Sequence, residues 1–129
     1  MIKTADLTGA QLDYHTARAQ GIPADRLEIR QVPRIDTLIC VEPFPSPVDE
    51  YRIPVVRPFC TAWHLAGALI EQHHLLLESD GAKEWAADIF HHGAIKWLRA
   101  TGSTPQVAIC RAVVRAAFGE QVEEVGVTE

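Results

Sequence analysis

The amino-acid sequence predicts an α+β fold in which a small antiparallel sheet packs against an N-terminal and a C-terminal helix, with a proline-rich loop between them. Three observations support this prediction. Two segments, 7–21 and 102–119, combine helix-capping residues with apolar residues at three- and four-residue spacing. Short runs rich in β-branched residues lie between them. The segment 43–58 holds five of the eight prolines, which central strands exclude because proline has no N–H.

The C-terminal helix, 102–119, has a marked start and a marked end. The Thr104 hydroxyl can cap its N-terminus, and Pro105 suits the first helical position because no backbone N–H is needed there. Gly119 can adopt the left-handed conformation that ends a helix. The predicted buried face comprises Val107, Cys110, Val114, Ala117 and Phe118.

The N-terminal helix, 7–21, begins with Thr8 and Gln11 at capping-box spacing, so each side chain can bond to the backbone amide of the other residue. Gly21 and Pro23 are expected to end this helix. Its predicted core face is less apolar than that of the C-terminal helix and comprises Leu12, His15, Thr16 and Ala19.

Between these helices the chain alternates between turns and short elements. Residues 22–34 are polar and irregular, whereas 35–41 is rich in β-branched residues and is predicted to be a strand. The proline-rich segment 43–58 is predicted to be a loop or an extended edge. Residues 61–70 form a predicted short helix that Thr61 can cap.

The second half of the chain is expected to supply most of the sheet. We predict a strand at 75–77 and two further strands at 85–90 and 94–98, joined by a turn that Gly93 permits. A helix over 85–90 is the alternative. Residues 120–129 form either a frayed tail or an additional edge strand.

Length and charge restrict the class of protein. The 129-residue chain is expected to form a single domain, 1–129, with a core of its own. Its net charge of −5 disfavours binding to nucleic acid or to an anionic membrane. It has no apolar run of membrane-spanning length and no signal-peptide pattern, so we expect a cytoplasmic protein. The three widely spaced cysteines predict reduced thiols.

Two histidine pairs are the first candidates for a metal site: His73 with His74, and His91 with His92. If each pair lies on a strand, adjacent side chains point to opposite faces, so each pair offers one ligand per face. One histidine from each pair and Cys60 could then converge. A zinc site needs three or four converging ligands, and no HExxH or CxxC spacing is present, so we expect no metal.

No catalytic constellation emerges from the sequence. Cys60 lies near His64, but no cysteine-protease signature surrounds it, and Cys110 falls on the apolar face of a helix, where a buried thiol is expected. The carboxylates are dispersed, and no phosphate-binding glycine motif occurs. We therefore expect no catalytic residue and no cofactor.

Three blocks of sequence resemble the NinX-like family of small phage and prophage proteins, for which no activity is established. These blocks are LTGAQLDY (7–14), WHLAGALIE (63–71) and GSTPQVAICRAVVRAAFGEQV (102–122). The last is the most specific, with its Gly-x-Thr-Pro start, mid-helix arginine and terminal Phe-Gly. His15 departs from the pattern, because the family usually has an aromatic residue there. The resemblance implies a phage or prophage accessory protein and no catalytic residues.

Four residues within these blocks are our candidate binding residues: Asp13, Trp63, Glu71 and Arg111. Packing can account for Trp63, but the other three lack a packing reason. Asp13, Glu71 and Arg111 either line a binding site together, or Arg111 forms a structural salt bridge with one of the two carboxylates. We favour the salt bridge.

The function that these observations favour is a non-enzymatic protein-interaction module that binds a host or phage protein. One alternative is an RNA- or DNA-binding module, because the order helix, strands, helix is that of a double-stranded-RNA-binding domain. A second alternative is a metal-dependent enzyme that uses the histidine pairs. An open sheet edge would also permit self-association into a homo-oligomer.

Overall fold

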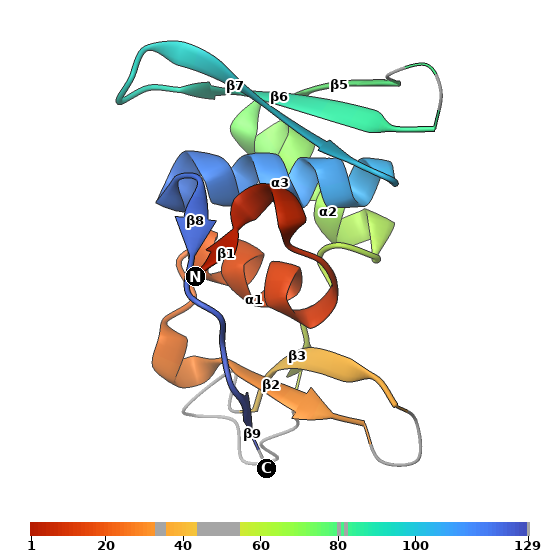
Figure 1. Ribbon diagram of the computed structural model, residues 1–129, viewed down its shortest axis with the longest axis vertical. Coiled ribbons are helices and arrows are strands. Elements are labelled where there is room, and N and C mark those ends of the chain that lie inside the picture. The colour runs from red at the N-terminus through yellow and green to blue at the C-terminus, as the bar shows by residue number, and fades with distance from the viewer. Residues whose placement is uncertain (33–35, 44–54, 80, 82, 129) are drawn as a thin grey trace.

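The computed structural model describes residues 1–32, 36–43, 55–79, 81 and 83–128. Its elements form stacked layers, with helices between an upper and a lower sheet (Figure 1). Helix α3 lies directly beneath the upper sheet, α1 packs under α3, and the lower sheet packs under α1. The predicted α+β class is confirmed. The strands, however, form three sheets instead of one.

The upper sheet contains β5 (Leu76–Ser79), β6 (Trp85–His91) and β7 (Lys96–Gly102), in that order. All its pairings are antiparallel. The predicted hairpin of 85–90 and 94–98 is confirmed, and the alternative helix over 85–90 is wrong. This sheet is built from consecutive strands, so short connections set its register.

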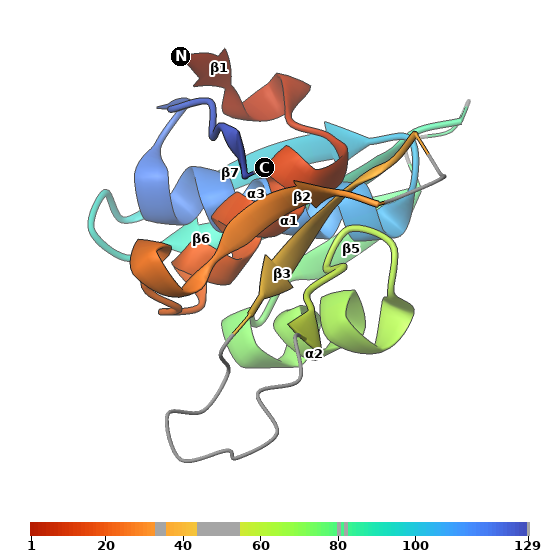
Figure 2. The same cartoon turned by 90° about the horizontal axis from the view of Figure 1, so that it is seen from below.

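The lower sheet has the order β4-β3-β2-β9. Its strands are β2 (Glu28–Gln31), β3 (Leu38–Glu42), β4 (Val55–Val56) and β9 (Val127–Thr128). Only the pairing of β2 with β9 is parallel. In Figure 2, β2 and β3 cross over α1.

Strand β3 confirms the strand predicted within 35–41, although it begins at Leu38. Strand β2 lies where the sequence predicts irregular chain, so that prediction is wrong. Ile29 is the only apolar residue of β2, and its side chain is fully buried. One apolar residue is too few to produce a period-two pattern in the sequence.

The proline-rich segment falls mostly outside the described residues, which resume at position 55. Just after this gap, β4 forms an edge of the lower sheet, in agreement with the predicted edge position. Strand β8 (Gln121–Val122) pairs with β1 (Ile2–Lys3), and β9 pairs with β2. The C-terminal residues therefore add edge strands, the second of the two predicted alternatives.

The helices are α1 (Gly9–Ala19), α2 (Trp63–His73) and α3 (Pro105–Phe118). Short 3-10 turns cover Thr4–Asp6 and Ala24–Arg26. Buried apolar side chains from the three helices and from β2, β3 and β6 form one cluster. Among the described residues, no helix is both long enough and apolar enough to span a membrane.

Helix α3 is covered on two opposite sides, by the upper sheet and by α1 and α2. Its buried residues are therefore Ala108, Ile109, Cys110, Ala112, Val113 and Val114. Cys110 and Val114 confirm the predicted face. Ala117 and Phe118 are exposed, so that part of the prediction is wrong. A single-stripe pattern assumes one covering layer, whereas this helix has two.

The predicted caps of α3 are confirmed. The Thr104 hydroxyl accepts a hydrogen bond from the Val107 N–H at 3.2 Å, and Gly119 ends the helix with a φ of +89°. Gly102 is required by close packing, because a Cβ there would lie 2.8 Å from the backbone nitrogen of Ala108. The turn into α3 therefore tolerates no side chain at this position.

The predicted capping box of α1 is wrong. The Thr8 side chain makes no capping hydrogen bond. The Gln11 amide instead holds the C-terminal tail, donating to the Val125 carbonyl at 2.7 Å and accepting from the Val125 N–H at 3.0 Å. Gly21, with a φ of +94°, ends the helix as predicted. The predicted core residues Leu12, His15 and Thr16 are all buried.

The helix predicted at 61–70 is also confirmed, but its predicted cap is not. Ala62 occupies the N-cap position of α2, and the Thr61 hydroxyl donates to the Pro58 carbonyl at 3.4 Å. Helix α2 also continues to His73, three residues beyond the predicted end.

These caps allow a matched test. Replacing Thr104 by alanine removes the hydrogen bond to the Val107 N–H, and we expect the free energy of unfolding to fall by about 1 kcal/mol. Thr8→Ala is the control, because Thr8 occupies the same position of α1 without a side-chain cap. Urea unfolding measures both variants. An equal loss in both would contradict the assignment of Thr104 as the working cap.

Candidate functional site

Arg111 joins three parts of the fold. From the middle of α3, its Nε donates to the Leu7 carbonyl at 2.9 Å and its Nη1 to the Thr101 carbonyl at 2.8 Å. These bonds connect the helix to the segment that precedes α1 and to strand β7. Burial lowers the pKa of Arg111, whereas the charges of Asp6 and Glu84 act in the opposite direction.

The favoured salt bridge of Arg111 with Asp13 or Glu71 is wrong. Among the described residues, no ion pair joins Arg111 to either carboxylate. Asp13 is engaged elsewhere in the interior, and Glu71 is exposed on α2. Two backbone carbonyls accept hydrogen bonds from Nε and Nη1 of Arg111 instead.

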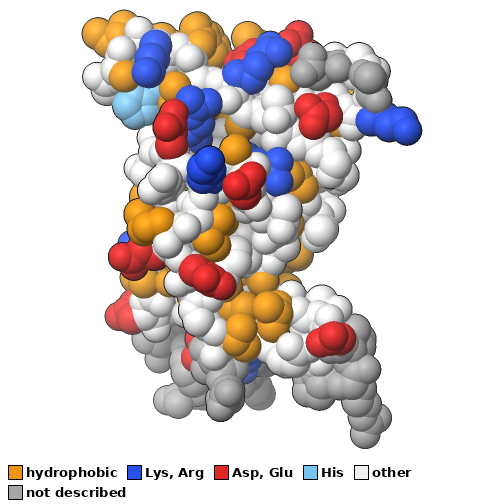
Figure 3. All heavy atoms as spheres, viewed as in Figure 1, with side chains coloured by type: hydrophobic (Ala, Val, Ile, Leu, Met, Phe, Trp, Pro, Cys, Tyr) orange, Lys and Arg blue, Asp and Glu red, His pale blue; other side chains and the backbone are white. Residues whose placement is uncertain are grey.

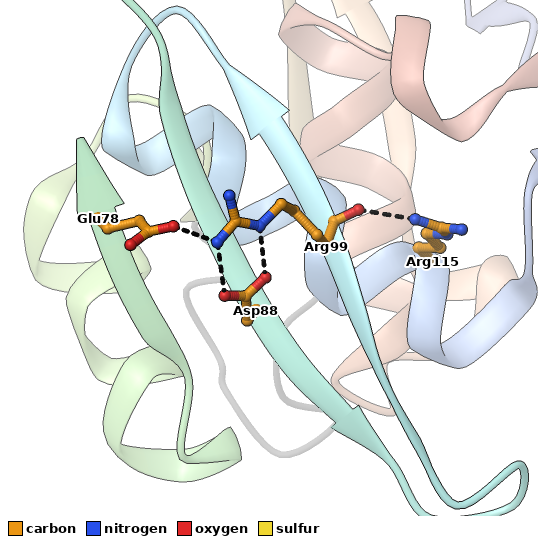
Figure 4. A network of polar contacts seen from close by, with 4 residues as sticks. All are labelled: Glu78, Asp88, Arg99 and Arg115. Atoms are coloured by element: carbon orange, nitrogen blue, oxygen red, sulfur yellow. Dashed lines mark hydrogen bonds and ion pairs between the residues drawn. The ribbon is translucent and has the colours of Figure 1, made fainter. Parts of the chain in front are cut away.

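Arg115, one turn further along α3, completes the same arrangement. Its Nη1 donates to the Arg99 carbonyl at 2.7 Å (Figure 4). Arg99 and Thr101 are two residues apart on β7, so their carbonyls point to the same side of the strand. Since β7 is an edge strand, these carbonyls have no neighbouring strand on that side. The two arginines of α3 therefore cover the exposed edge of the upper sheet.

Asp13 is a buried carboxylate that stabilises the fold. Its side chain is buried, and Oδ1 accepts a hydrogen bond from the Cys60 N–H at 2.7 Å. Burial raises the pKa of Asp13, and hydrogen bonds from Cys60 partly oppose that shift. Asp13 thus ties α1 to the segment that leads into α2.

The three cysteines are free thiols in buried positions. Burial raises the pKa of Cys40 and of Cys110 to about 12, and it also raises the pKa of Cys60. The Cys60 thiol contacts the Gly9 carbonyl at 3.5 Å, whereas His64 is exposed on α2. A protonated, buried thiol is a poor nucleophile, which argues against catalysis by Cys60.

The two histidine pairs lie at the ends of different elements. His73 is the last residue of α2 and His74 follows with a φ of +53°, so this pair does not lie on a strand. His91 ends β6 and His92 lies in the turn that follows, as the predicted hairpin requires. His73, His91 and His92 nevertheless line one hollow of about 310 Å³ beside α3. Within the described part of the chain, no group of three histidine, cysteine or carboxylate side chains is arranged to hold a metal ion.

His15 helps to hold the C-terminal tail. It is buried, and its Nε2 lies 2.9 Å from the Glu123 carbonyl oxygen. Its ring makes edge contacts with Tyr14 and Phe118, at centroid distances of 5.3 and 6.5 Å. The imidazole thus packs as an aromatic side chain would. Burial lowers the pKa of His15 from its ordinary value of 6.5.

Trp63 and Glu71 lie on the exposed side of α2. The Trp63 side chain is 51% exposed, and a Cβ at Gly67 would lie 4.0 Å from its ring. The ring therefore leans over Gly67, one turn along the helix, and Glu71 follows after another turn. The four candidate residues do not converge on one site: Asp13 and Arg111 support the interior, whereas Trp63 and Glu71 face solvent.

No helix or strand of the described residues covers the outer face of the upper sheet. Arg99 crosses its centre, with its Nε 2.9 Å from Oδ1 of Asp88 and its Nη2 bonded to both Asp88 and Glu78 (Figure 4). These carboxylates raise the pKa of Arg99. Exposed apolar side chains, including Trp97, gather toward the β6–β7 turn at the upper left of Figure 3.

A pocket of about 370 Å³, which the sequence does not predict, lies between β7, α3 and the N-terminal segment. Its lining residues are Lys3, Thr4, Ala5, Arg99, Ala100, Thr101, Arg111, Arg115, Glu120 and Gln121. The sequence does show that Arg111 and Arg115, which are four residues apart, lie on the same side of the C-terminal helix, and these two residues form the α3 part of the lining. The pairing of β1 with β8 adds Lys3 to the lining, and no local pattern shows that pairing.

The sequence model of the family described as Bacteriophage P22, NinX, matches residues 3–116. The match includes α1, α2, the upper sheet and α3 as far as residue 116. A comparison with curated proteins gave no match.

Arg111 should contribute strongly to stability. We expect Arg111→Met to lower the free energy of unfolding by about 3 kcal/mol, because it leaves the Leu7 and Thr101 carbonyls without their donor. Arg115→Met, which removes one more exposed carbonyl contact, should lower it by about 1 kcal/mol. Denaturant unfolding of both variants checks this order, and a reversed order would refute the central role of Arg111.

His15 should make stability depend on pH. Because burial depresses its pKa in the folded state, the unfolded chain takes up the proton more readily. Stability is therefore full above the unfolded pKa of 6.5 and should fall as the pH drops through that value toward the folded pKa. His73, whose pKa burial also lowers, adds to the same trend.

The check is urea unfolding between about pH 7.5 and about pH 5.5. His15→Gln should flatten the dependence of stability on pH relative to the wild type. His64→Gln, at an exposed position on α2, is the matched control and should leave the dependence unchanged. If His15→Gln retains the full wild-type slope, the pH dependence has another origin.

Proposed function

The chain belongs to the bacteriophage P22 NinX family, and we propose that it is a phage accessory protein that acts as a non-enzymatic protein-interaction module. Its partner is a host or phage protein. The observation that carries this proposal is the exposed face of α2, formed by Trp63, Gly67 and Glu71, which we call the α2 face.

The α2 face has the composition of a protein-binding surface. A half-exposed tryptophan leaves a large apolar ring in water, and tryptophan is enriched among the residues that dominate binding energy. Gly67 leaves the flank of the Trp63 ring open, because it has no side chain. Glu71 adds a charged group beside it that can set the orientation of a partner.

Asp13 and Arg111 have a supporting role in this proposal. Asp13 accepts a hydrogen bond from the Cys60 N–H and so positions the segment that leads into α2. Arg111 holds α3, against which α2 packs. Neither needs to touch the partner.

Several features favour binding over catalysis. The thiols are buried with raised pKa values, and the candidate carboxylates Asp13 and Glu71 lie in different environments. The Cys60 thiol does contact the Asp13 carboxylate, but burial and that carboxylate both raise the pKa of Cys60, which keeps the thiol protonated and a poor nucleophile. We further propose that the protein is cytoplasmic and that 1–129 forms one domain.

Nucleic-acid binding is the second candidate, and one observation favours it. The segment from α2 to α3 has the order helix, three antiparallel strands, helix, with both helices on one side of the sheet. That is the order of a double-stranded-RNA-binding domain, although a shared fold does not establish function. Within 63–118, five basic residues are balanced by five acidic ones, so this unit lacks a positive charge excess.

The test is binding to a partner captured from phage-infected host lysate, then identified, purified and titrated against variants. Trp63→Ala should weaken the affinity at least tenfold, that is by about 1.4 kcal/mol or more, and Glu71→Gln should weaken it less. Trp97→Ala is the matched control, since Trp97 is 53% exposed on the upper sheet. It should bind as the wild type does.

Two outcomes would overturn the proposal. One is an equal loss of affinity in Trp63→Ala and Trp97→Ala, which would remove the α2 face from the interaction. The other is saturable binding to double-stranded RNA that weakens steeply with salt, which would favour the second candidate.

A further inference from the structure

We propose that the pocket between β7, α3 and the N-terminal segment binds the phosphate group of a small molecule. This site is separate from the α2 face and does not depend on the proposed function. The three side chains that carry it are Lys3, Arg111 and Arg115, and we call it the β7-edge pocket.

The β7-edge pocket is large enough for a small ligand. Its volume of about 370 Å³ falls within the range of about 300–1,000 Å³ that small-molecule sites occupy. Its shape is held by the fold: Arg111 binds the Leu7 and Thr101 carbonyls, and the Thr4 hydroxyl donates to the Gly119 carbonyl at 2.7 Å. The walls are therefore formed before a ligand arrives.

The pocket contains a cation, Arg111, on which the charges of Asp6 and Glu84 act without forming an ion pair within the described residues. Arg111 is half-buried, and its two hydrogen bonds go to neutral carbonyls. A guanidinium has five N–H donors, and these bonds occupy only Nε and Nη1. A bound anion would compensate the charge of Arg111 and bond to its remaining donors.

Arg115 and Lys3 extend the same positive lining. The Nη2 of Arg115 lies 3.3 Å from Oε1 of Glu120, whose side chain is 82% exposed. Such an exposed contact is weak and easily exchanged. The Glu120 carboxylate therefore marks a position where an oxyanion is accepted, and an incoming phosphate would replace it.

Arg99 also lines the pocket, but its guanidinium is turned to the outer face of the sheet. There Asp88 and Glu78 hold it (Figure 4). Arg99 therefore forms part of the pocket wall, but its guanidinium is not available to bind a ligand there.

Phosphate fits this lining better than a carboxylate does. A phosphate ester carries up to two negative charges and three terminal oxygens, which match three cations from two elements, Lys3 of β1 and Arg111 and Arg115 of α3. A small molecule also fits better than a polymer. The chain has a net charge of −5, and acidic side chains are interleaved with the basic ones on this face (Figure 3). A long polyanion would meet this repulsion on either side of the pocket.

The experiment titrates the full chain with inorganic phosphate and with a nucleoside monophosphate at constant ionic strength, followed by NMR chemical shifts. We expect saturable shifts at Lys3, Arg111 and Arg115. Lys3→Gln combined with Arg115→Gln should weaken binding at least about tenfold, and Glu120→Gln should tighten it about twofold. Lys96→Gln, which removes an exposed lysine outside the pocket, is the matched control and should change affinity less than about twofold.

The single variant Lys3→Gln keeps the test valid if the double variant is unstable, because Lys3 is exposed and its side chain supports no described contact. It should weaken phosphate binding by about threefold on its own. Absence of saturable binding by the wild type would overturn the proposal. So would equal weakening by Lys96→Gln, equal affinity for acetate and phosphate, or tighter binding of a single-stranded oligonucleotide that Lys96→Gln also weakens.

Discussion

The burial of α3 on two opposite sides is the constraint on which the rest of the structure depends. The upper sheet covers one side, and α1 and α2 cover the other. The buried residues of α3 are small or β-branched, so two layers can approach one helix closely; they are Ala108, Ile109, Cys110, Ala112, Val113 and Val114. The turn into the helix is equally tight, because Gly102 lies against the backbone of Ala108. Because α3 is held between two layers, the side chains on its two uncovered flanks have fixed positions relative to both layers.

Arg111 and Arg115 occupy one of those flanks, and their role follows from it. Strand β7 ends the upper sheet at this side, so the carbonyls of Arg99 and Thr101 would otherwise lack a donor from a neighbouring strand. The two arginines bind these carbonyls and close the edge against another strand. In doing so they bring two cations into a pocket of an acidic protein. Covering the edge and forming the β7-edge pocket are thus two consequences of one arrangement.

The candidate binding residues divide according to burial. Asp13 is an interior acceptor for the Cys60 N–H, and Arg111 is an interior donor to two carbonyls. Trp63 and Glu71 have no comparable structural task and lie in solvent on α2. A residue that satisfies a buried polar group is explained by stability, whereas an exposed tryptophan belongs to the residue type that most often dominates binding energy. The α2 face therefore carries the interaction hypothesis, and the interior pair supports it.

The sequence by itself determined the local features: the α+β class, the family, the cap and end of α3, the Gly21 end of α1 and the β6–β7 hairpin. These depend on residues close together in the chain, so spacing and capping chemistry reveal them. Tertiary structure alone decided the partners of Gln11 and Arg111, the strand at 28–31 and the β7-edge pocket. Gln11 has capping-box spacing but bonds to Val125, and Arg111 bonds to Leu7, more than a hundred residues away. Such choices depend on which groups folding brings within hydrogen-bond distance, and no local pattern records that distance.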